Sequence, residues 1–180
     1  MQALIFLVKS LADLYLLTFL MRFIMQWVRA GYNNPLAQFI FKITNPLVVP
    51  ARRVLPSVAG LDVPTLIVLM VLEVVVTFVL LRLVGLPLPV PVVLFYSLLR
   101  LIALVLWFYF GATLVCALLS WFGERGRNPI GYFLSELVEP LLRPARRLLP
   151  PMSGFDLSPL IVLLLLQAAM YALPLPQFLR

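Results

Sequence analysis

Histidine is absent from the 180 residues, and cysteine occurs once, at Cys116. One chain of this kind cannot form a disulfide framework, a CxxC redox pair, a zinc site of the usual cysteine and histidine type or a haem-attachment motif. Acidic residues are also few, because 7 Asp and Glu stand against 14 Lys and Arg and only 12% of the residues are charged. These absences remove most enzyme chemistries, so we expect no enzymatic activity, no cofactor and no metal.

Hydrophobic residues make up 63% of the chain, far more than the roughly half that is usual in soluble domains. The formal net charge is +7. In so apolar a chain, a basic excess favours contact with anionic lipid headgroups. No basic run is interleaved with stacking aromatic residues, so we expect no nucleic-acid partner.

Four apolar stretches approach the length of about 20 residues that a helix needs to cross a bilayer. They are residues 3–28, 63–84, 92–122 and 158–173. The fourth is short, since prolines interrupt it. The first has no basic flank and no small-residue cleavage site, so we expect it to be retained as a membrane helix. The sequence therefore predicts an all-α membrane protein with four transmembrane helices.

The chain contains an internal repeat. Residues 34–69 align without a gap to residues 128–163, and nearly half of the aligned positions are identical. We divide the chain into a first repeat, 1–84, a proline-rich linker, 85–92, and a second repeat, 93–180. Each repeat holds two spans, so both hairpins are expected to enter the membrane in the same direction. Most cations lie between the paired spans, which places those segments in the cytoplasm and both termini in the periplasm.

The segments between the paired spans, 35–60 and 129–154, are not plain loops. In each one, apolar residues recur at three- and four-residue spacing, which predicts an amphipathic helix lying in the headgroup plane. We expect Pro46 and Pro140 to end this helix, because proline removes a donor and clashes with the preceding turn.

In each copy, an arginine pair then stands between two prolines. The first proline is expected to open a second, shorter helical turn, where its missing N–H costs nothing, and the second to close it. These opening and closing prolines are Pro50 and Pro56 in the first copy, and Pro144 and Pro150 in the second. The guanidinium groups are thereby held at phosphate depth, and we predict that they contact anionic lipid or a partner protein. The predicted contact residues are Arg52, Arg53, Arg143, Arg146 and Arg147.

Each segment ends in Gly-x-Asp. Gly60 and Gly154 permit a tight reversal. Asp62 and Asp156 are expected either to accept from free N–H groups at the start of the next span or to pair with the arginines. In the second copy Ser158 is a better N-cap than either. The other residues that we assign to the repeat motif are Asn34, Pro35, Asn128, Pro129, Glu139 and Pro159.

With these residues the chain resembles the YggT family, also called the YGGT-repeat or YlmG family, of bacterial and plastid membrane proteins. Residues 120–167 look like the family's motif throughout, and residues 34–73 are similar to it with departures. Where the second copy has Glu139, Arg143 and Ser158-Pro159, the first has Asn45, Val49 and Pro64-Thr65.

The resemblance implies a small multi-pass protein of the bacterial cytoplasmic membrane, and no enzymatic activity comes with it. It further implies links to tolerance of osmotic or extracytoplasmic stress, to division and nucleoid organisation and, in plastids, to cytochrome maturation.

Five ionisable residues lie within the predicted spans, where one mid-helix charge costs at least about 2.5 kcal/mol. Lys9 and Asp13 are four residues apart and are expected to neutralise each other. Arg22 and Glu73 have similar depths in an antiparallel hairpin, so we predict an interhelical ion pair, for which Arg100 is a competitor. Such pairs either hold the spans together, which we favour, or line an ion or proton pathway.

Two functions follow. The first is a non-enzymatic membrane protein that organises lipid or partner proteins through its basic segments. The alternative is an oligomeric ion channel or transporter subunit that uses the intramembrane charges. An enzyme is the weakest reading, because no base, metal site or phosphate loop accompanies the few acidic residues. The partners we expect are anionic lipids, with a second copy of the chain or another membrane protein also possible.

Overall fold

The computed structural model describes residues 2–31, 34–57, 60–121, 129–148 and 156–179. Over these residues the chain is helical and contains no strand, which confirms the all-α fold class. The helices are α1 (Gln2–Val28), α2 (Pro35–Val54), α3 (Val63–Leu83), α4 (Val90–Trp121), α5 (Pro129–Leu148) and α6 (Ser158–Ala172), and a 3₁₀ turn, η1 (Gln177–Leu179), follows.

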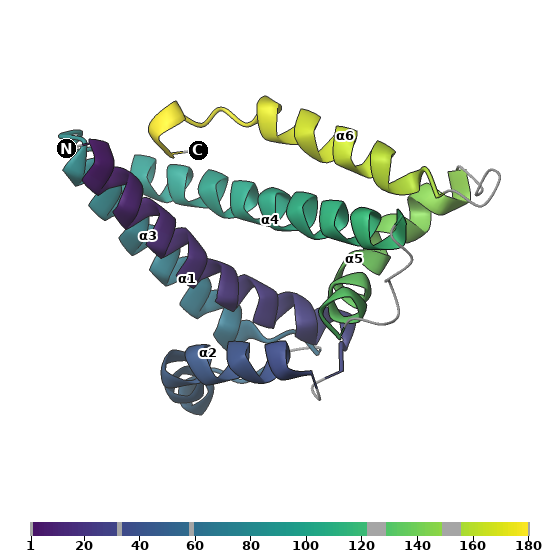
Figure 1. The fold of residues 1–180 in the computed structure, drawn as a ribbon. Helices are drawn as coiled ribbons and strands as arrows, with labels where there is room; N and C mark the ends of the chain where they lie inside the picture. The colour runs from purple at the N-terminus through teal and green to yellow at the C-terminus, as the bar shows by residue number, and fades with distance from the viewer. Residues whose placement is uncertain (1, 32–33, 58–59, 122–128, 149–155, 180) are drawn as a thin grey trace.

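The same order of helices occurs twice: a long apolar helix, a helix with two inner prolines, and a second apolar helix. Within each set, the two apolar helices pack against each other, α1 on α3 and α4 on α6. Figure 1 shows α1 and α4 both starting near the end of the molecule that holds the two termini, with α2 and α5 lying where they finish.

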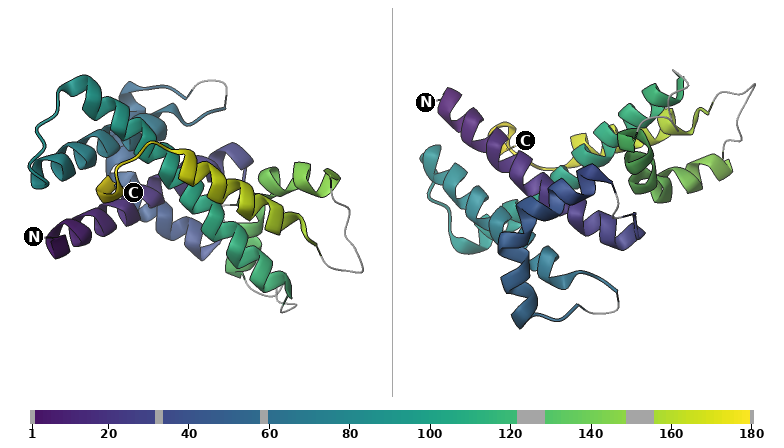
Figure 2. Two further views of the ribbon diagram at one scale, coloured as in Figure 1. Left: turned by 90° about the horizontal axis from the view of Figure 1, so that it is seen from above. Right: turned by 60° about the horizontal axis from the view of Figure 1, so that its bottom comes forward.

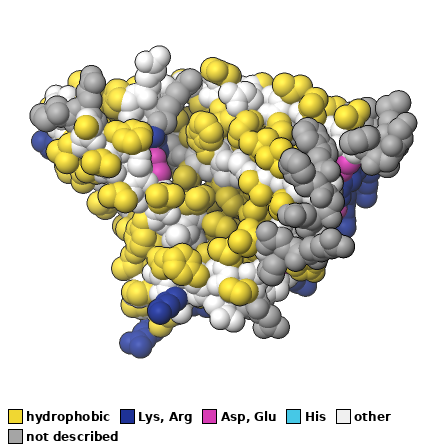
Figure 3. All heavy atoms as spheres, viewed as in Figure 1, with side chains coloured by type: hydrophobic (Ala, Val, Ile, Leu, Met, Phe, Trp, Pro, Cys, Tyr) yellow, Lys and Arg dark blue, Asp and Glu magenta, His cyan; other side chains and the backbone are white. Residues whose placement is uncertain are grey.

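In the part of the chain that the structure describes, three helices are long and apolar enough to cross a membrane: Ala3–Val28, Val63–Leu83 and Val90–Ser120. They coincide with the first three predicted spans. The fourth, α6, has only 15 residues, or roughly 22 Å of helix against the roughly 30 Å of a hydrocarbon core. Four spans therefore stay a prediction. Many large apolar side chains on α1, α3 and α4 face outward, and hydrophobic side chains are spread widely over the face in Figure 3, as expected of a surface that faces lipid.

The turn after α3 is built on Gly85, whose φ is +77°. The N–H of Leu86 donates to the carbonyl of Leu81 at 2.9 Å, and the N–H of Gly85 donates to Arg82 at 3.0 Å. This hydrogen-bond pattern ends a helix with a left-handed residue, a conformation that glycine adopts without strain. The predicted proline-rich linker begins there, but α4 already starts at Val90, within it.

The prediction that Pro46 and Pro140 end their helices is wrong. Both prolines lie inside continuous helices, as do Pro50 and Pro144, which were expected to open a separate turn. The ring removes one hydrogen bond and displaces the preceding turn, and a helix can accommodate this by bending. Figure 2 shows α2 changing direction along its length, so the chain bends there and continues.

Residues of the repeat motif lie at both ends of α2 in the first copy. Asn34 caps α2 by accepting from the N–H of Leu36 at 2.9 Å, with Pro35 as the first helical residue. Pro56 follows the C-cap of α2, and Gly60 has a φ of +81° at the reversal toward α3. In the second copy, Asn128, Pro150 and Gly154 lie outside the described residues.

Candidate functional site

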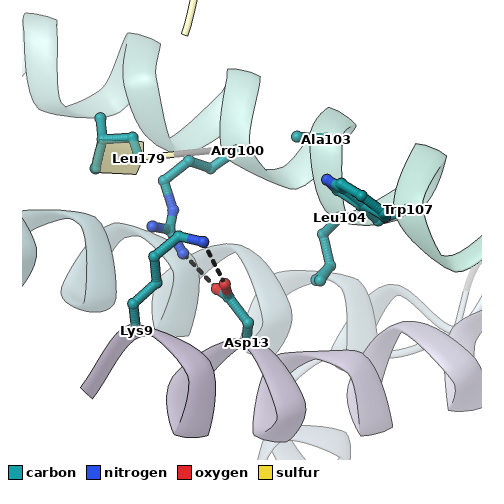
Figure 4. A pocket seen from close by; sticks show the side chains of 7 residues that line it. All are labelled: Lys9, Asp13, Arg100, Ala103, Leu104, Trp107 and Leu179. Carbon is teal, nitrogen blue, oxygen red and sulfur yellow. Dashed lines mark hydrogen bonds and ion pairs between the residues drawn. The ribbon is translucent and has the colours of Figure 1, made fainter. Parts of the chain in front are cut away.

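Four ionisable side chains from three helices meet in one place, and we call Lys9, Asp13, Glu73 and Arg100 the charge cluster. Arg100 on α4 donates from Nε to Glu73 Oε1 on α3 at 2.7 Å and from Nη2 to Asp13 Oδ1 on α1 at 2.6 Å. Lys9 Nζ lies 3.3 Å from the second oxygen of Asp13. Figure 4 shows the Lys9 and Arg100 side chains converging on Asp13. The expected Lys9–Asp13 pair is thus present.

The charge cluster is most deeply buried at Arg100 and Glu73. Their side chains are 4% and 2% exposed, whereas those of Lys9 and Asp13 are 21% and 29% exposed. A buried guanidinium needs a carboxylate partner, because a lone charge in an apolar interior costs several kcal/mol. Arg100 has two such partners on different helices, so it ties α1, α3 and α4 together.

The predicted ion pair between Arg22 and Glu73 is wrong, because Glu73 pairs with Arg100 and Arg22 binds residues of α2. Arg22 Nη1 donates to Thr44 Oγ1 at 2.6 Å and to Asn45 Oδ1 at 2.9 Å, both on α2. Its side chain is 2% exposed. The two residues also lie at different depths: Arg22 Nε is 3.9 Å from Asp62, just before α3, whereas Glu73 is eleven residues further along that helix, or roughly 16 Å. Arg22 therefore fastens the interhelical segment to α1.

In both copies, the first arginine of the pair binds the aspartate of the following Gly-x-Asp, and we call each of these contacts an arginine clasp. Arg52 Nη2 donates to Asp62 Oδ2 at 2.7 Å. At the equivalent positions of the second copy, Arg146 Nε donates to Asp156 Oδ2 at 3.0 Å. The clasp joins the end of α2 or α5 to the start of the next apolar helix. Of the two roles proposed for the aspartates, pairing with arginine is therefore realised in both copies.

The surroundings of the two clasps differ. Asp62 is fully buried, and Thr65 donates to it at 2.5 Å, while Arg22 Nε lies 3.9 Å away. Asp156 accepts from the N–H of Ser158 at 3.0 Å and also from its hydroxyl. Helix α6 begins at Ser158, so Ser158 is its first residue, with Pro159 second, and not the N-cap that we expected.

Glu139 completes the second clasp. Arg146 Nη1 donates to both carboxylate oxygens of Glu139, at 3.0 and 2.8 Å. The first copy has Asn45 at this position, and Asn45 accepts from Arg22. The second copy therefore has an ion pair between Arg146 and Glu139, and at the equivalent position of the first copy Asn45 instead accepts a hydrogen bond from the buried Arg22.

The second arginine of each pair is turned outward. Arg53 and Arg147 are exposed, as are Lys42 and Arg143 on the same two helices. The burial pattern of α2 explains the difference, since its buried residues recur at three- and four-residue spacing as Ala37, Ile40, Thr44 and Val48. Adjacent helical residues differ by about 100° in direction, so two neighbouring arginines cannot both face an aspartate.

Sequence reasoning missed Thr44, Asn45 and Thr65 as partners of buried charges. Their signal is weak, because a threonine or asparagine in a helix is also common on solvated faces. The only clue is that Thr44 falls on the apolar stripe of α2, where a polar group needs a buried partner. Among the described residues, no three Cys, Asp or Glu side chains come together as ligands of a metal ion.

The second clasp predicts a stability loss in acid. Partial burial raises the pKa of Asp156, but hydrogen bonds from Ser158 and the charge of Arg146 outweigh it, so the pKa lies below its ordinary value of 3.8. A carboxylate with a lowered folded-state pKa contributes stability above its unfolded pKa, and that contribution disappears as the pH falls through the folded-state pKa. We expect the melting temperature of the protein in detergent to fall below about pH 4. The fall should be smaller in Asp156→Asn, and equal pH profiles would contradict the clasp.

The helices and the charges that they bury define a class: an all-helical protein whose long apolar helices suit it to a lipid bilayer. The chain belongs to the CCB3/YggT family, whose model matches residues 1–84 and 95–177. The expected resemblance is thus confirmed, and the two matched segments correspond closely to the two repeats.

Relatives of similar length occur in several bacteria. The chain is 40% identical over 166 residues to the uncharacterized protein YggT of Escherichia coli (strain K12), covering 92% of this chain and 86% of that protein. It is 39% identical over 172 residues to an uncharacterized protein of Vibrio alginolyticus, covering 94% and 92%. It is 37% identical over 167 residues to one from Pseudomonas aeruginosa, covering 92% and 85%. No solved structure matches the chain significantly.

Proposed function

We propose that the chain is a non-enzymatic, multi-pass protein of the bacterial cytoplasmic membrane that organises lipid or partner proteins through α2 and α5. In this role it would support tolerance of osmotic or extracytoplasmic stress, or the organisation of membrane and division complexes. The observation that carries the proposal is the outward direction of Arg53 and Arg147, held at equivalent positions by two arginine clasps.

The exposed surface of α2 and α5 suits a membrane interface. On α2 the exposed cations lie beside exposed apolar side chains, among them Phe39 and Val54, which are 58% and 81% exposed. On α5, Ile130 and Tyr132 are exposed in the same way. Apolar groups that enter the acyl boundary beside cations that meet phosphates are the marks of a helix lying in the interface plane.

The topology that we propose has α2 and α5 on the cytoplasmic side and both termini in the periplasm. The concentration of arginine on α2 and α5 supports this orientation. Helix α6 is then a short fourth span, around which the bilayer becomes thinner. Fusion reporters at residue 87, in the linker, and at the two termini would report one side of the membrane, and reporters next to α2 and α5 the other.

Replacing Arg53 and Arg147 by glutamine tests the proposal without breaking the clasps. Each cation near an anionic surface contributes about 1 kcal/mol, so the loss of two cations should lower the selective retention of anionic over zwitterionic lipid during purification roughly thirtyfold. Native mass spectrometry of the purified protein measures this retention. The matched control is Arg82→Gln, which removes an exposed cation from the opposite end of α3.

Stress tolerance of cells and recovery of crosslinked membrane partners should fall in the same double variant. If Arg53→Gln with Arg147→Gln behaves like Arg82→Gln in all three measurements, α2 and α5 are not the acting surface.

A second candidate is an oligomeric ion channel or transporter subunit. The charge cluster favours it, because an unbroken chain of alternating charges leads from buried Glu73 through Arg100 and Asp13 to partly exposed Lys9. Such chains of ionisable groups occur in proton relays. Liposomes containing the protein would then show ion or proton flux under an imposed potential, and Glu73→Gln would reduce it. Silent liposomes at several lipid compositions would remove this candidate.

A further inference from the structure

We propose that the cavity beside the charge cluster binds the headgroup of a phospholipid that carries a primary ammonium and a phosphate. Asp13 would accept from the ammonium, and Lys9 and Arg100 would donate to the phosphate. The site lies near the termini, away from the clasps, and does not depend on the function proposed for α2 and α5.

The cavity has a polar end and an apolar extension. Its volume is 280 Å³, and it is lined by Lys9, Asp13, Arg100, Ala103, Leu104, Trp107 and Leu179. A second cavity of 250 Å³ shares Ala103 and Trp107 with it and is also lined by Gln167, Met170 and Tyr171 of α6 and by Leu175, beyond the end of that helix. Figure 4 shows the charged side chains at one side of the first cavity, with Leu104 and Trp107 at the other. Such a pair of cavities fits a ligand that is charged at one end and apolar at the other.

The polar end has unused hydrogen-bonding capacity. Arg100 is 4% exposed, yet its Nη1 has no acceptor among the residues that the structure describes. A buried donor without a partner lowers the stability of a protein, so such atoms call for an explanation. Lys9 Nζ forms an ion pair with Asp13, and an ammonium has three donors. A phosphate oxygen is an acceptor suited to both groups.

The balance of charge favours a zwitterion over an anion. The two cations of the charge cluster are matched by two carboxylates, Asp13 and Glu73, so the site has no net positive charge. A purely anionic headgroup would bring its charge close to Asp13 without a compensating cation. A primary ammonium on the ligand meets Asp13, which is 29% exposed and can accept another hydrogen bond. A quaternary ammonium has no N–H to donate, so an ethanolamine headgroup fits better than a choline one.

The surroundings indicate that the ligand arrives from the bilayer. Leu11, Trp107 and Tyr171, on the three helices around the cavities, are 67%, 56% and 70% exposed. In Figure 3, the charged side chains that meet on this face are surrounded by hydrophobic ones. A headgroup carried by acyl chains can reach such a site, whereas a free solute would have to leave water to do so.

Trp107 provides a direct probe of occupancy, because it lines both cavities. We would replace Trp27 and Trp121 by phenylalanine and reconstitute the protein in bilayers with lipids brominated on their acyl chains, which quench tryptophan on contact. The quenching of Trp107 gives a relative binding constant for each lipid. We expect this constant to be about tenfold larger for brominated phosphatidylethanolamine than for brominated phosphatidylcholine or phosphatidylglycerol. This preference corresponds to one charge-assisted hydrogen bond.

Two variants test the site from different directions. Lys9→Gln removes a phosphate donor and leaves the Asp13–Arg100 pair intact, while Ala103→Leu fills the space between the two cavities. Lys9→Gln should weaken the binding of all three lipids about tenfold, because the phosphate is common to them, and Ala103→Leu should bring the preference to within about twofold of unity because it closes the site. Ala168→Leu adds the same bulk at an exposed position of α6 that lines neither cavity and should keep the preference. Circular dichroism shows whether each variant keeps its helical structure. If Ala103→Leu does not fold, the smaller change Ala103→Val takes its place.

The proposal is overturned by equal quenching with all three lipids, by a preference for phosphatidylglycerol, by binding that Lys9→Gln does not weaken, or by a preference that Ala103→Leu does not change. Displacement of the brominated lipid by millimolar free phosphoethanolamine would overturn the assignment to a lipid. A preference that free phosphoethanolamine leaves unchanged supports the lipid.

Discussion

Replacing Arg100 by glutamine is expected to lower the free energy of unfolding by about 3–5 kcal/mol, the usual cost of removing one partner from a buried ion pair. Arg100 bonds to carboxylates of α1 and α3, and the glutamine would leave Glu73 buried without a positive partner. Denaturation of the purified protein in mixed micelles, followed by circular dichroism, measures the change. Unfolding should also begin with loss of the contacts among α1, α3 and α4.

The control for this prediction is Arg82→Gln. Arg82 is exposed, and its guanidinium lies over the ring of Phe78 at 5.0 Å, a contact of about 0.5–1 kcal/mol. Adding Glu73→Gln to Arg100→Gln should recover much of the lost stability, because two neutral amides replace an unpaired buried charge. If Arg100→Gln is no less stable than Arg82→Gln, the charge cluster does not hold the helices together.

The spans and the family could be predicted from the sequence because both depend on one-dimensional patterns. Bilayer thickness fixes a length, and the first three spans meet it as helices. The repeat needs only a comparison of the chain with itself. The same comparison with bilayer thickness predicts that the fourth span is short, and α6 has 15 residues.

The partners of the buried charges could not be predicted in the same way. Counting residues from the ends of the predicted spans placed Arg22 and Glu73 at similar depths, but in the structure Arg22 lies near Asp62, at the start of α3, and Arg100 joins Glu73 to Asp13. Arg22 turns toward α2, where Thr44 and Asn45 lie within 3 Å. Arg100 reaches Glu73 from the second repeat. The order of the helices in the bundle decides such pairs, and the sequence does not contain that order explicitly.

The prediction that Pro46 and Pro140 end their helices was wrong because it considered only local backbone effects. A proline inside a helix costs about 3 kcal/mol in isolation, which favours an end at Pro46 and Pro140. Packing can offset this cost: α2 buries Ala37 and Ile40 before the first inner proline and Val48 after it, so both halves are held by contacts with the rest of the protein. The different roles of adjacent arginines, by contrast, follow from helical periodicity and could have been predicted.

Asp62→Ala should destabilise the protein far more than the equivalent Asp156→Ala, although both remove the carboxylate of an arginine clasp. Asp62 is fully buried beside Arg22, which is 2% exposed, and beside Arg52. Its removal leaves a buried guanidinium with the neutral acceptors of Thr44 and Asn45, so we expect a loss of about 3–5 kcal/mol. Denaturant unfolding in micelles gives both values under one set of conditions.

The second copy supplies the matched comparison. Asp156 is 21% exposed, and Arg146 keeps Glu139 as a bidentate partner when the aspartate is removed. Solvent also reaches Arg146, which is 32% exposed. We therefore expect Asp156→Ala to cost about 1–2 kcal/mol, including the lost hydrogen bonds to Ser158. Equal losses in the two variants would mean that Arg22 does not depend on Asp62, and that the two clasps are energetically equivalent despite their different burial.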